Sequence, residues 1–252
     1  MPSHPPARRS VAALSAAVAL LLSPTTAPTP AHAGLSERAI NGHAGHDRLV
    51  GTQRSDHIQA RAGRDSVDAR GGSDDVNGGA GPDRLTGGGG NDRVMTGAGN
   101  DVATGGPGRD DVIGQNGDDA LNGDAGADHV SGGAGGDTVT GGDGNDEMDG
   151  GDGNDVIDAG PGDDQMTGDA GDDVIYPGPG ADLVYAEEGD GNHVVAADDG
   201  VRDDIWCVRK EMIGSSSGLL TYVGSRDRAD LLHGCRVDVV GGAEARRAGL
   251  LL

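Results

Sequence analysis

The chain has 252 residues, of which 49 are Gly and only 2% are aromatic, and its 42 acidic residues outnumber its 19 basic residues to give a formal net charge of −23. So polar and acidic a chain cannot bury enough apolar surface to offset the conformational entropy lost on folding. This composition excludes an ordinary globular core, and it excludes nucleic acid as a partner because phosphate backbones require a basic surface. If the chain folds, something must neutralise its charge, and a divalent cation is the simplest candidate.

Residues 1–33 are predicted to be a cleaved signal peptide. Arg8 and Arg9 give a positive start, residues 11–22 form an apolar run, and Ala31-His32-Ala33 is a small-residue cleavage site. The apolar run is too short to span a membrane, and no second apolar run follows, so no transmembrane segment is expected. We therefore expect a secreted, extracellular protein.

The main feature of the chain is a repeat of nine residues. From Asp47 to Asp182 an Asp stands at every ninth position, and an apolar residue stands two positions after each Asp. Gly stands two positions before each Asp, except where Arg54 replaces it. Apolar residues at a spacing of 3.6, which a helix requires, do not occur in this stretch. The period therefore indicates a β-structure made of stacked repeats.

Each part of the repeat has a physical reason. The glycines allow positive φ, so the first six residues are expected to form a turn. The single apolar residue suits a three-residue strand with one side chain pointing inward. One such strand buries almost nothing alone, so the copies must stack to make a core. Carboxylates and turn carbonyls together offer the hard oxygen ligands that calcium prefers.

This pattern resembles the RTX, or hemolysin-type calcium-binding, repeat G-G-x-G-x-D-x-U-x, and the clearest copies are residues 141–149 and 150–158. The resemblance implies an all-β fold, a right-handed parallel β-roll with two nonapeptides per coil. It also implies multiple Ca²⁺ ions between the turns of neighbouring coils, held by the motif Asp and backbone carbonyls. We expect a linker at 34–41 and the roll over 42–195, with the best repeats at 78–185. The expected metal ligands are Asp83, Asp92, Asp101, Asp110, Asp119, Asp128, Asp137, Asp146, Asp155, Asp164, Asp173 and Asp182.

The earliest copies depart from the motif. Arg54 replaces the inner Gly of one copy, and Ala60-Arg61 and Ala69-Arg70 replace the leading glycines of two others. A cation or a Cβ where the backbone should wrap an ion weakens binding. We therefore expect Asp56 and Asp65 to be poor ligands.

The two outer faces of the roll should differ, because residues 18 apart are expected to stack. One face is predicted to be neutral and to carry Val102, Ala120, Thr138, Val156 and Val174, with Thr86, Thr104, Asn122 and Thr140 beside them. The other is predicted to be charged and to carry Asp75, Arg93, Asp111, His129, Glu147 and Gln165. The neutral face has two interpretations: β-branched residues that simply favour strands, or a flat contact surface for a protein, a cell-surface glycan or ice.

After residue 186 the period slips by one residue and the motif is lost, and residues 196–252 differ in composition. Strands are predicted at 203–207, 219–223 and 234–237. Cys207 and Cys235 are expected to form a disulfide, since an even number of cysteines in an exported chain is usually paired; two free thiols are the alternative. The segment is similar to the tails of exported RTX-repeat proteins and is expected to be a small disulfide-linked cap, with a flexible tail as the alternative.

The sequence does not indicate an enzyme. Residues 214–218 match the nucleophile pattern G-x-S-x-G, and Asp227 and His233 follow in hydrolase order, but the short tail after Ser216 cannot supply the sheet that this motif needs. The favoured function is an exported calcium-binding repeat protein that folds on binding Ca²⁺ outside the cell. The alternatives are an adhesin-like or ice- or polysaccharide-binding rod that uses the neutral face and, more remotely, a serine hydrolase.

Overall fold

A computed structural model describes residues 38–186, 192–197, 201–206, 219–223, 231–233 and 236–240, the last three segments as backbone only. All regular structure in these residues is β-strand, in two parallel sheets. The odd sheet contains β1 (Arg38–Asn41), β3 (Asp56–Ala62), β5 (Asp75–Ala80), β7 (Arg93–Ala98), β9 (Asp111–Asn116), β11 (His129–Ala134), β13 (Glu147–Asp152), β15 (Gln165–Ala170), β17 (Leu183–Tyr185), β19 (Asp204–Trp206) and β21 (Leu231–His233). The even sheet contains β2 (Arg48–Val50), β4 (Ser66–Asp68), β6 (Arg84–Thr86), β8 (Val102–Gly108), β10 (Ala120–Gly126), β12 (Thr138–Asp143), β14 (Val156–Asp158), β16 (Val174–Tyr176), β18 (His193–Ala197), β20 (Leu219–Val223) and β22 (Arg236–Val240).

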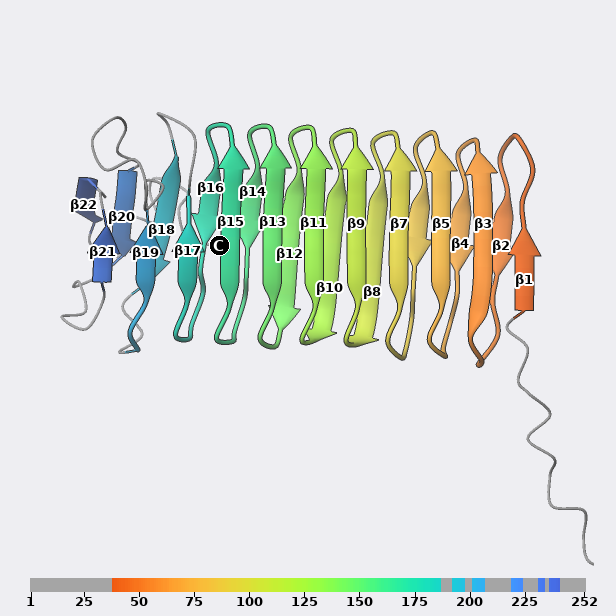
Figure 1. The fold of residues 1–252 in the computed structure, drawn as a ribbon, viewed down its shortest axis with the longest axis horizontal. Coiled ribbons are helices and arrows are strands. Elements are labelled where there is room, and N and C mark those ends of the chain that lie inside the picture. The colour runs from red at the N-terminus through yellow and green to blue at the C-terminus, as the bar shows by residue number, and fades with distance from the viewer. Residues whose placement is uncertain are drawn as a thin grey trace, which may run out of the picture. The chain divides into compact units, whose positions relative to one another are not determined.

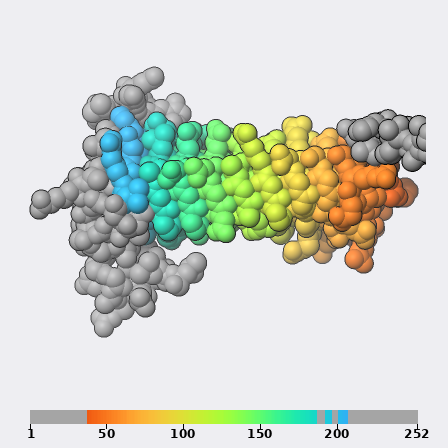
Figure 2. Space-filling view, turned by 90° about the horizontal axis from the view of Figure 1, so that it is seen from below, coloured from red at the N-terminus to blue at the C-terminus, as the bar shows by residue number. Residues whose placement is uncertain are grey.

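The chain alternates between the two sheets, so one strand of each sheet and the turns between them make one coil of a parallel β-solenoid (Figure 1). Within each sheet the register follows the repeat: Arg93 lies beside Asp111, and Asp111 lies beside His129, 18 residues apart each time. The prediction that residues 18 apart stack is thus confirmed up to Tyr185. Figure 2 shows the described coils following one another in chain order.

Many strands are longer than the three residues predicted. β4 and β6 have three residues, but β3 and β10 have seven. The extra length comes from the leading residues of the next repeat, which were expected to be turn: Ala60 and Arg61 in β3, and Gly123 and Asp124 in β10. Gly97 pairs in register with Gly79 at a φ of 112°, a conformation that Gly adopts without strain. Parallel pairing therefore continues past the apolar position and into the motif.

The core is one continuous cluster of apolar side chains from both sheets. The residue two positions after each motif Asp points inward, as predicted, and is almost fully buried from Ile58 onward. These residues are Ile58, Val67, Val76, Leu85, Val94, Ala103, Val112, Leu121, Val130, Val139, Met148, Ile157, Met166, Ile175 and Val184. Ala60, Ala69 and Ala159 take the first motif position and also point inward, fully buried. A Cβ at that position therefore enters the core.

The residues predicted for the two outer faces lie in register as expected, but the even face is not neutral throughout, because Arg84 lies beside Val102 and Asp158 lies beside Thr140. Val102, Ala120 and Thr138 lie in register on the even sheet, followed by Val156, which is 38% exposed. The charged residues predicted for the other face lie in register on the odd sheet.

At the N-terminal end, residues 38–41 were expected to belong to a linker, but they form β1. Ile40 aligns with Ile58, so this segment supplies an apolar residue in the phase of the repeat and can pair with β3. At the other end the predicted strands at 203–207, 219–223 and 234–237 are present as β19, β20 and β22, and they continue the two sheets.

Several predicted features lie outside the described residues. They are the signal peptide at 1–33, the two cysteines and their disulfide, and the G-x-S-x-G segment with Asp227. No helix in the described part of the chain is long and apolar enough to cross a membrane.

Candidate metal centre

The motif Asp residues form two files, one beside each sheet, at the point where each turn enters a strand. The odd file precedes the odd strands and contains Asp56, Asp74, Asp92, Asp110, Asp128, Asp146, Asp164 and Asp182. The even file precedes the even strands and contains Asp47, Asp65, Asp83, Asp101, Asp119, Asp137, Asp155 and Asp173. Apart from half-buried Asp47, each is between 0% and 4% exposed. All twelve predicted ligands therefore lie in two columns of buried carboxyl groups.

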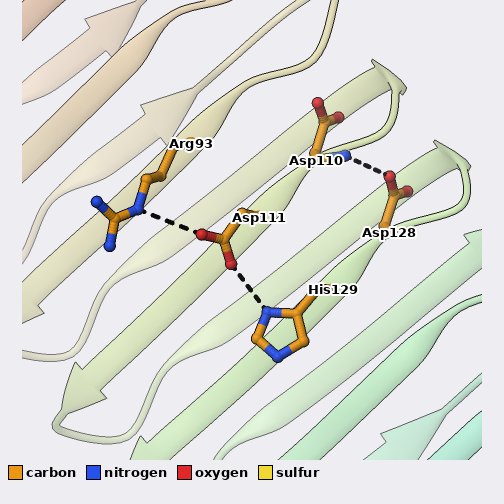
Figure 3. Close-up of polar contacts among 5 residues, drawn as sticks. All are labelled: Arg93, Asp110, Asp111, Asp128 and His129. Carbon is orange, nitrogen blue, oxygen red and sulfur yellow. Dashed lines mark hydrogen bonds and ion pairs between the residues drawn. The ribbon is translucent and has the colours of Figure 1, made fainter.

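One oxygen of each carboxylate joins neighbouring coils. The backbone N–H of Asp83 donates to Oδ1 of Asp101 at 2.6 Å, and that of Asp110 donates to Oδ1 of Asp128 at 2.7 Å (Figure 3). The same bond recurs in both files, from the N–H of Asp47 to that of Asp164. Oδ1 is thus committed to holding the next coil in register.

The other oxygen has no such partner. Oδ2 is buried without a hydrogen bond in Asp65, Asp74, Asp83, Asp92, Asp110, Asp119, Asp128, Asp137, Asp146, Asp155, Asp164 and Asp173. It lies next to the residue that opens its own repeat: a Cβ on Gly114 would come within 2.6 Å of Oδ2 of Asp119, and one on Gly132 within 2.5 Å of Oδ2 of Asp137. A buried anionic oxygen without a partner is costly unless a cation or a proton reaches it.

Asn192 shows which partner the Oδ2 atoms of the motif Asp residues are missing. It takes the place of the motif Asp after Asp173, because its Oδ1 accepts the N–H of Asp173 at 2.8 Å. The nitrogen of the same side-chain amide, Nδ2, donates to the backbone carbonyl of Ala186, six residues earlier. At the equivalent position every Asp carries an oxygen that cannot donate. A carboxylate oxygen at that position therefore needs a cation or a proton, where the amide nitrogen of Asn192 finds a carbonyl.

Burial raises the pKa of these carboxyl groups in the metal-free chain. The pKa rises to about 7 for Asp110, Asp119 and Asp173, mainly because burial disfavours the charged form. A backbone N–H bond works in the opposite direction, and the neighbouring carboxylates of the same file raise the pKa further. For Asp74, Asp83, Asp155 and Asp164 the pKa rises to about 6.

These shifts predict that acid stabilises the metal-free fold. A carboxyl group whose pKa is higher in the folded chain than its ordinary value of 3.8 binds its proton more tightly there. The penalty that it imposes at high pH therefore begins to decrease as pH falls through the folded pKa and is gone below the ordinary value. With calcium chelated, the β-sheet signal in circular dichroism should therefore grow as pH falls from 8 to 5. A signal that stays constant or decreases over this range would contradict the prediction.

The donor set fits calcium only if backbone oxygens join it. No group of three or more His, Cys, Asp or Glu side chains that could hold a metal occurs among the described residues. A file with one carboxylate per coil cannot form such a group, whereas calcium takes six to eight oxygens and accepts backbone carbonyls. The turns bring a backbone carbonyl of one coil close to the motif carboxylate of the next: a Cβ on Gly144 would lie 1.3 Å from the carbonyl oxygen of Gly126 and 3.3 Å from Oδ1 of Asp146. Only a bare glycine backbone allows this approach.

The first repeats follow the same backbone course as the later ones, but their motif carboxylates make different contacts. Oδ2 of Asp56 accepts bonds from the N–H and the hydroxyl of Thr52, at 2.6 and 2.9 Å. Arg61 and Arg70 take the glycine position at φ of 87° and 78°, which is strained for a residue with a Cβ. Weak binding by Asp56 and Asp65 stays a prediction.

Two contributions to the site were missed in the sequence. Asn192 and Asp203 continue the files, and Oδ1 of Asp203 accepts the N–H of Asp182 at 3.1 Å. The sequence signal for both was a polar residue two positions before a buried apolar residue, Val194 or Ile205. In several repeats the residue before the motif Asp forms a second ladder. Oδ1 of Asn154, for example, accepts the N–H of Asp172 at 3.0 Å. The recurrence of Asn at this position could have indicated it.

The fold and the files define a class: a parallel β-solenoid with buried carboxylates repeated at every turn. The sequence model of the RTX calcium-binding nonapeptide repeat (4 copies) matches the chain in overlapping segments, at residues 41–76, 69–103, 104–139, 131–166, 140–175, 149–184 and 158–192. These segments run without a gap from residue 41 to residue 192, more than half of the chain, so the chain belongs to the RTX calcium-binding nonapeptide repeat family. No curated protein matches the chain significantly.

Proposed function

We propose that this protein is an exported calcium-binding repeat protein whose β-roll, with two nonapeptides per coil, folds when several Ca²⁺ ions bind outside the cell. The observation that carries the proposal is the pair of buried Asp files, in which Oδ2 has no hydrogen bond in Asp65, Asp74, Asp83, Asp92, Asp110, Asp119, Asp128, Asp137, Asp146, Asp155, Asp164 and Asp173. The ligands proposed are the twelve Asp residues from Asp83 to Asp182 together with turn carbonyls.

The chain itself does the structural part of this work. The N–H bond to Oδ1 orients each carboxylate, and the glycine turns bring backbone oxygens of adjacent coils near it. Bound calcium supplies positive charge to carboxylates that would otherwise repel one another along each file. Because little apolar surface is buried in each repeat, this neutralisation decides whether the coils stay together.

A calcium titration tests the proposal. The circular dichroism spectrum of the purified chain at pH 7.5 should change from coil to β-sheet as calcium rises through about 10⁻⁴–10⁻³ M, the range of extracellular calcium modules. Magnesium should not substitute, because it demands a smaller octahedral shell and releases water reluctantly. A spectrum that is already β-rich in chelator and unchanged by calcium would refute folding on ion binding.

Export is proposed from the N-terminal pattern alone. If the pattern functions as a signal peptide, the chain recovered from the culture medium should begin at Gly34, after the small-residue site that ends at Ala33. N-terminal sequencing of the secreted chain measures this directly. Retention of Met1 on chain that stays in the cells would contradict export by this route.

A further inference from the structure

The outer face of the odd sheet carries a row of polar residues, one from each strand from β3 to β13. In strand order they are His57, Asp75, Arg93, Asp111, His129 and Glu147. Each immediately follows a motif Asp, so the row runs along the coils. Cationic or hydrogen-bond-donating residues alternate with carboxylates at every step.

Neighbours in the row are already in contact. Arg93 Nε lies 3.2 Å from Oδ2 of Asp111, and His129 Nδ1 lies 2.8 Å from its Oδ1 (Figure 3). These three side chains are 53%, 38% and 44% exposed. His57 Nδ1 is likewise 2.8 Å from Oδ2 of Asp75. The row is therefore an ordered line of partial and full charges on an accessible surface.

The surface beside this row is flat and apolar at its centre. The next outward-facing positions of β7 and β9 are Met95 and Ile113, both half-buried and in register. Beyond them the same line of the sheet holds Gly79, Gly97, Gln115 and Gly133. Gln115 is exposed, but the glycines on either side of it project no side chain, so a second flat surface can still approach Met95 and Ile113.

The row is complementary to itself when reversed. Consider a second copy packed face to face, related by a two-fold axis that runs along the strand direction between β7 and β9. Arg93 then faces Asp111 of the second copy, Asp75 faces His129, and His57 faces Glu147. The same axis places Met95 opposite Ile113. Every carboxylate of the row meets a donor, and every contact occurs twice, as an isologous interface requires.

The register is specific. Displacing the second copy by one strand in one direction places Arg93 opposite Arg93 and Asp75 opposite Asp111. In the other direction it places Asp111 opposite Asp111 and Asp75 opposite Glu147, so either displacement brings like charges together. Displacing it by two strands restores opposite signs but loses the outermost pairs and separates Met95 from Ile113. The even sheet, with Val102, Thr138 and Val156 at the equivalent positions, has no such alternation.

We propose that the protein forms a symmetric antiparallel dimer through the odd sheet from β3 to β13. Six strands about 4.8 Å apart and about 20 Å long offer on the order of 500 Å² per copy, so about 1,000 Å² would be buried in total, near the lower limit for a specific complex. The dimer is therefore reversible. This inference goes beyond calcium binding. It rests on the proposed function only in that calcium must fold the coils before the odd sheet can form an interface.

The dimer can be tested by sedimentation velocity on the purified chain in saturating calcium, over a concentration series. The wild-type chain should pass from monomer to dimer as concentration rises. Arg93→Asp and Asp111→Arg should each weaken dimerisation at least about tenfold, because each puts like charges in contact at the centre. An equimolar mixture of the two variants should dimerise again, since each acidic centre then faces a basic one.

The mixing step separates the interface from the stability of a single chain, because neither variant regains its own Arg93–Asp111 pair. Thr138→Arg, on the even sheet, is the matched control and should dimerise as the wild type does. A wild-type chain that is monomeric at every concentration overturns the dimer, and so does a mixture that behaves like its separate components. Circular dichroism on the same samples reports folding independently, so a calcium-insensitive spectrum refutes the proposed function and not the dimer.

Discussion

Replacing Gly144 by Ala should prevent stable folding at a calcium concentration that folds the wild-type chain. The new Cβ would lie 1.3 Å from the carbonyl oxygen and 2.5 Å from the carbonyl carbon of Gly126, both backbone atoms of the preceding coil. The residue also has a φ of 151°. No side-chain movement relieves this overlap, so the two coils must separate. We expect a loss of about 3 kcal/mol or more in the free energy of unfolding.

Gly89→Ala is the matched control for this substitution. Gly89 also lies in a motif turn, but a Cβ there would meet no heavy atom within 4 Å. Urea denaturation of both variants and the wild type in saturating calcium measures the difference. The prediction fails if the two substitutions have equal effects, because the close packing of successive turns would then not limit stability.

Asp119→Asn should have opposite effects with and without calcium. The amide oxygen can still accept the N–H of Asp101, which now bonds Oδ1 at 2.8 Å, as Asn192 does naturally for Asp173. Without metal the substitution removes a buried carboxylate whose pKa is raised to about 7, so the chain should gain β-sheet signal in chelator at pH 7.5 or above. With calcium it removes a charged ligand, and the calcium midpoint should rise by about threefold or more.

Asp56→Asn is the control, because the Asp56 carboxylate already accepts two bonds from Thr52. It should leave the calcium midpoint nearly unchanged. The two measurements are the calcium titration by circular dichroism and the same spectrum in chelator. An Asp119 variant that is destabilised under both conditions would indicate that the carboxylate is only a structural hydrogen-bond acceptor, and the role of the files in binding cations would be wrong.

Much of the fold could be predicted because the nine residues of one repeat already determine which side chain points inward. The phase of Asp and the apolar residue determines which side chains point inward, so Val130 and Ile157 could be placed in the core from the sequence. The spacing of 18 between stacked residues follows from two sheets that alternate. The positions of the carboxylates in two files follow from the same phase.

What could not be predicted depends on backbone geometry that composition does not reveal. Leading positions of the motif suit both turns and extended strands at positive φ, whether glycine or, as at Arg61 and Asp124, another residue holds them, so the extension of β3 and β10 was missed. Asn192 was missed because the slipped copy replaces the acid with an amide, and only the bond from Asp173 identifies its role. The bond between Oδ1 and the N–H of the neighbouring coil was also missed, because a motif indicates a ligand and does not show what else the ligand holds.

The bond from each motif N–H to the following coil gives the solenoid a direction. The backbone N–H of Asp110 donates to Oδ1 of Asp128, and the backbone N–H of Asp182 donates to Oδ1 of Asp203. The motif N–H of each turn is therefore satisfied by its successor, although the residue before it, such as Asp172, donates to the preceding coil. A chain that emerges N-terminus first cannot finish any turn until the next 18 residues have followed it. Assembly should consequently trail emergence by one coil throughout.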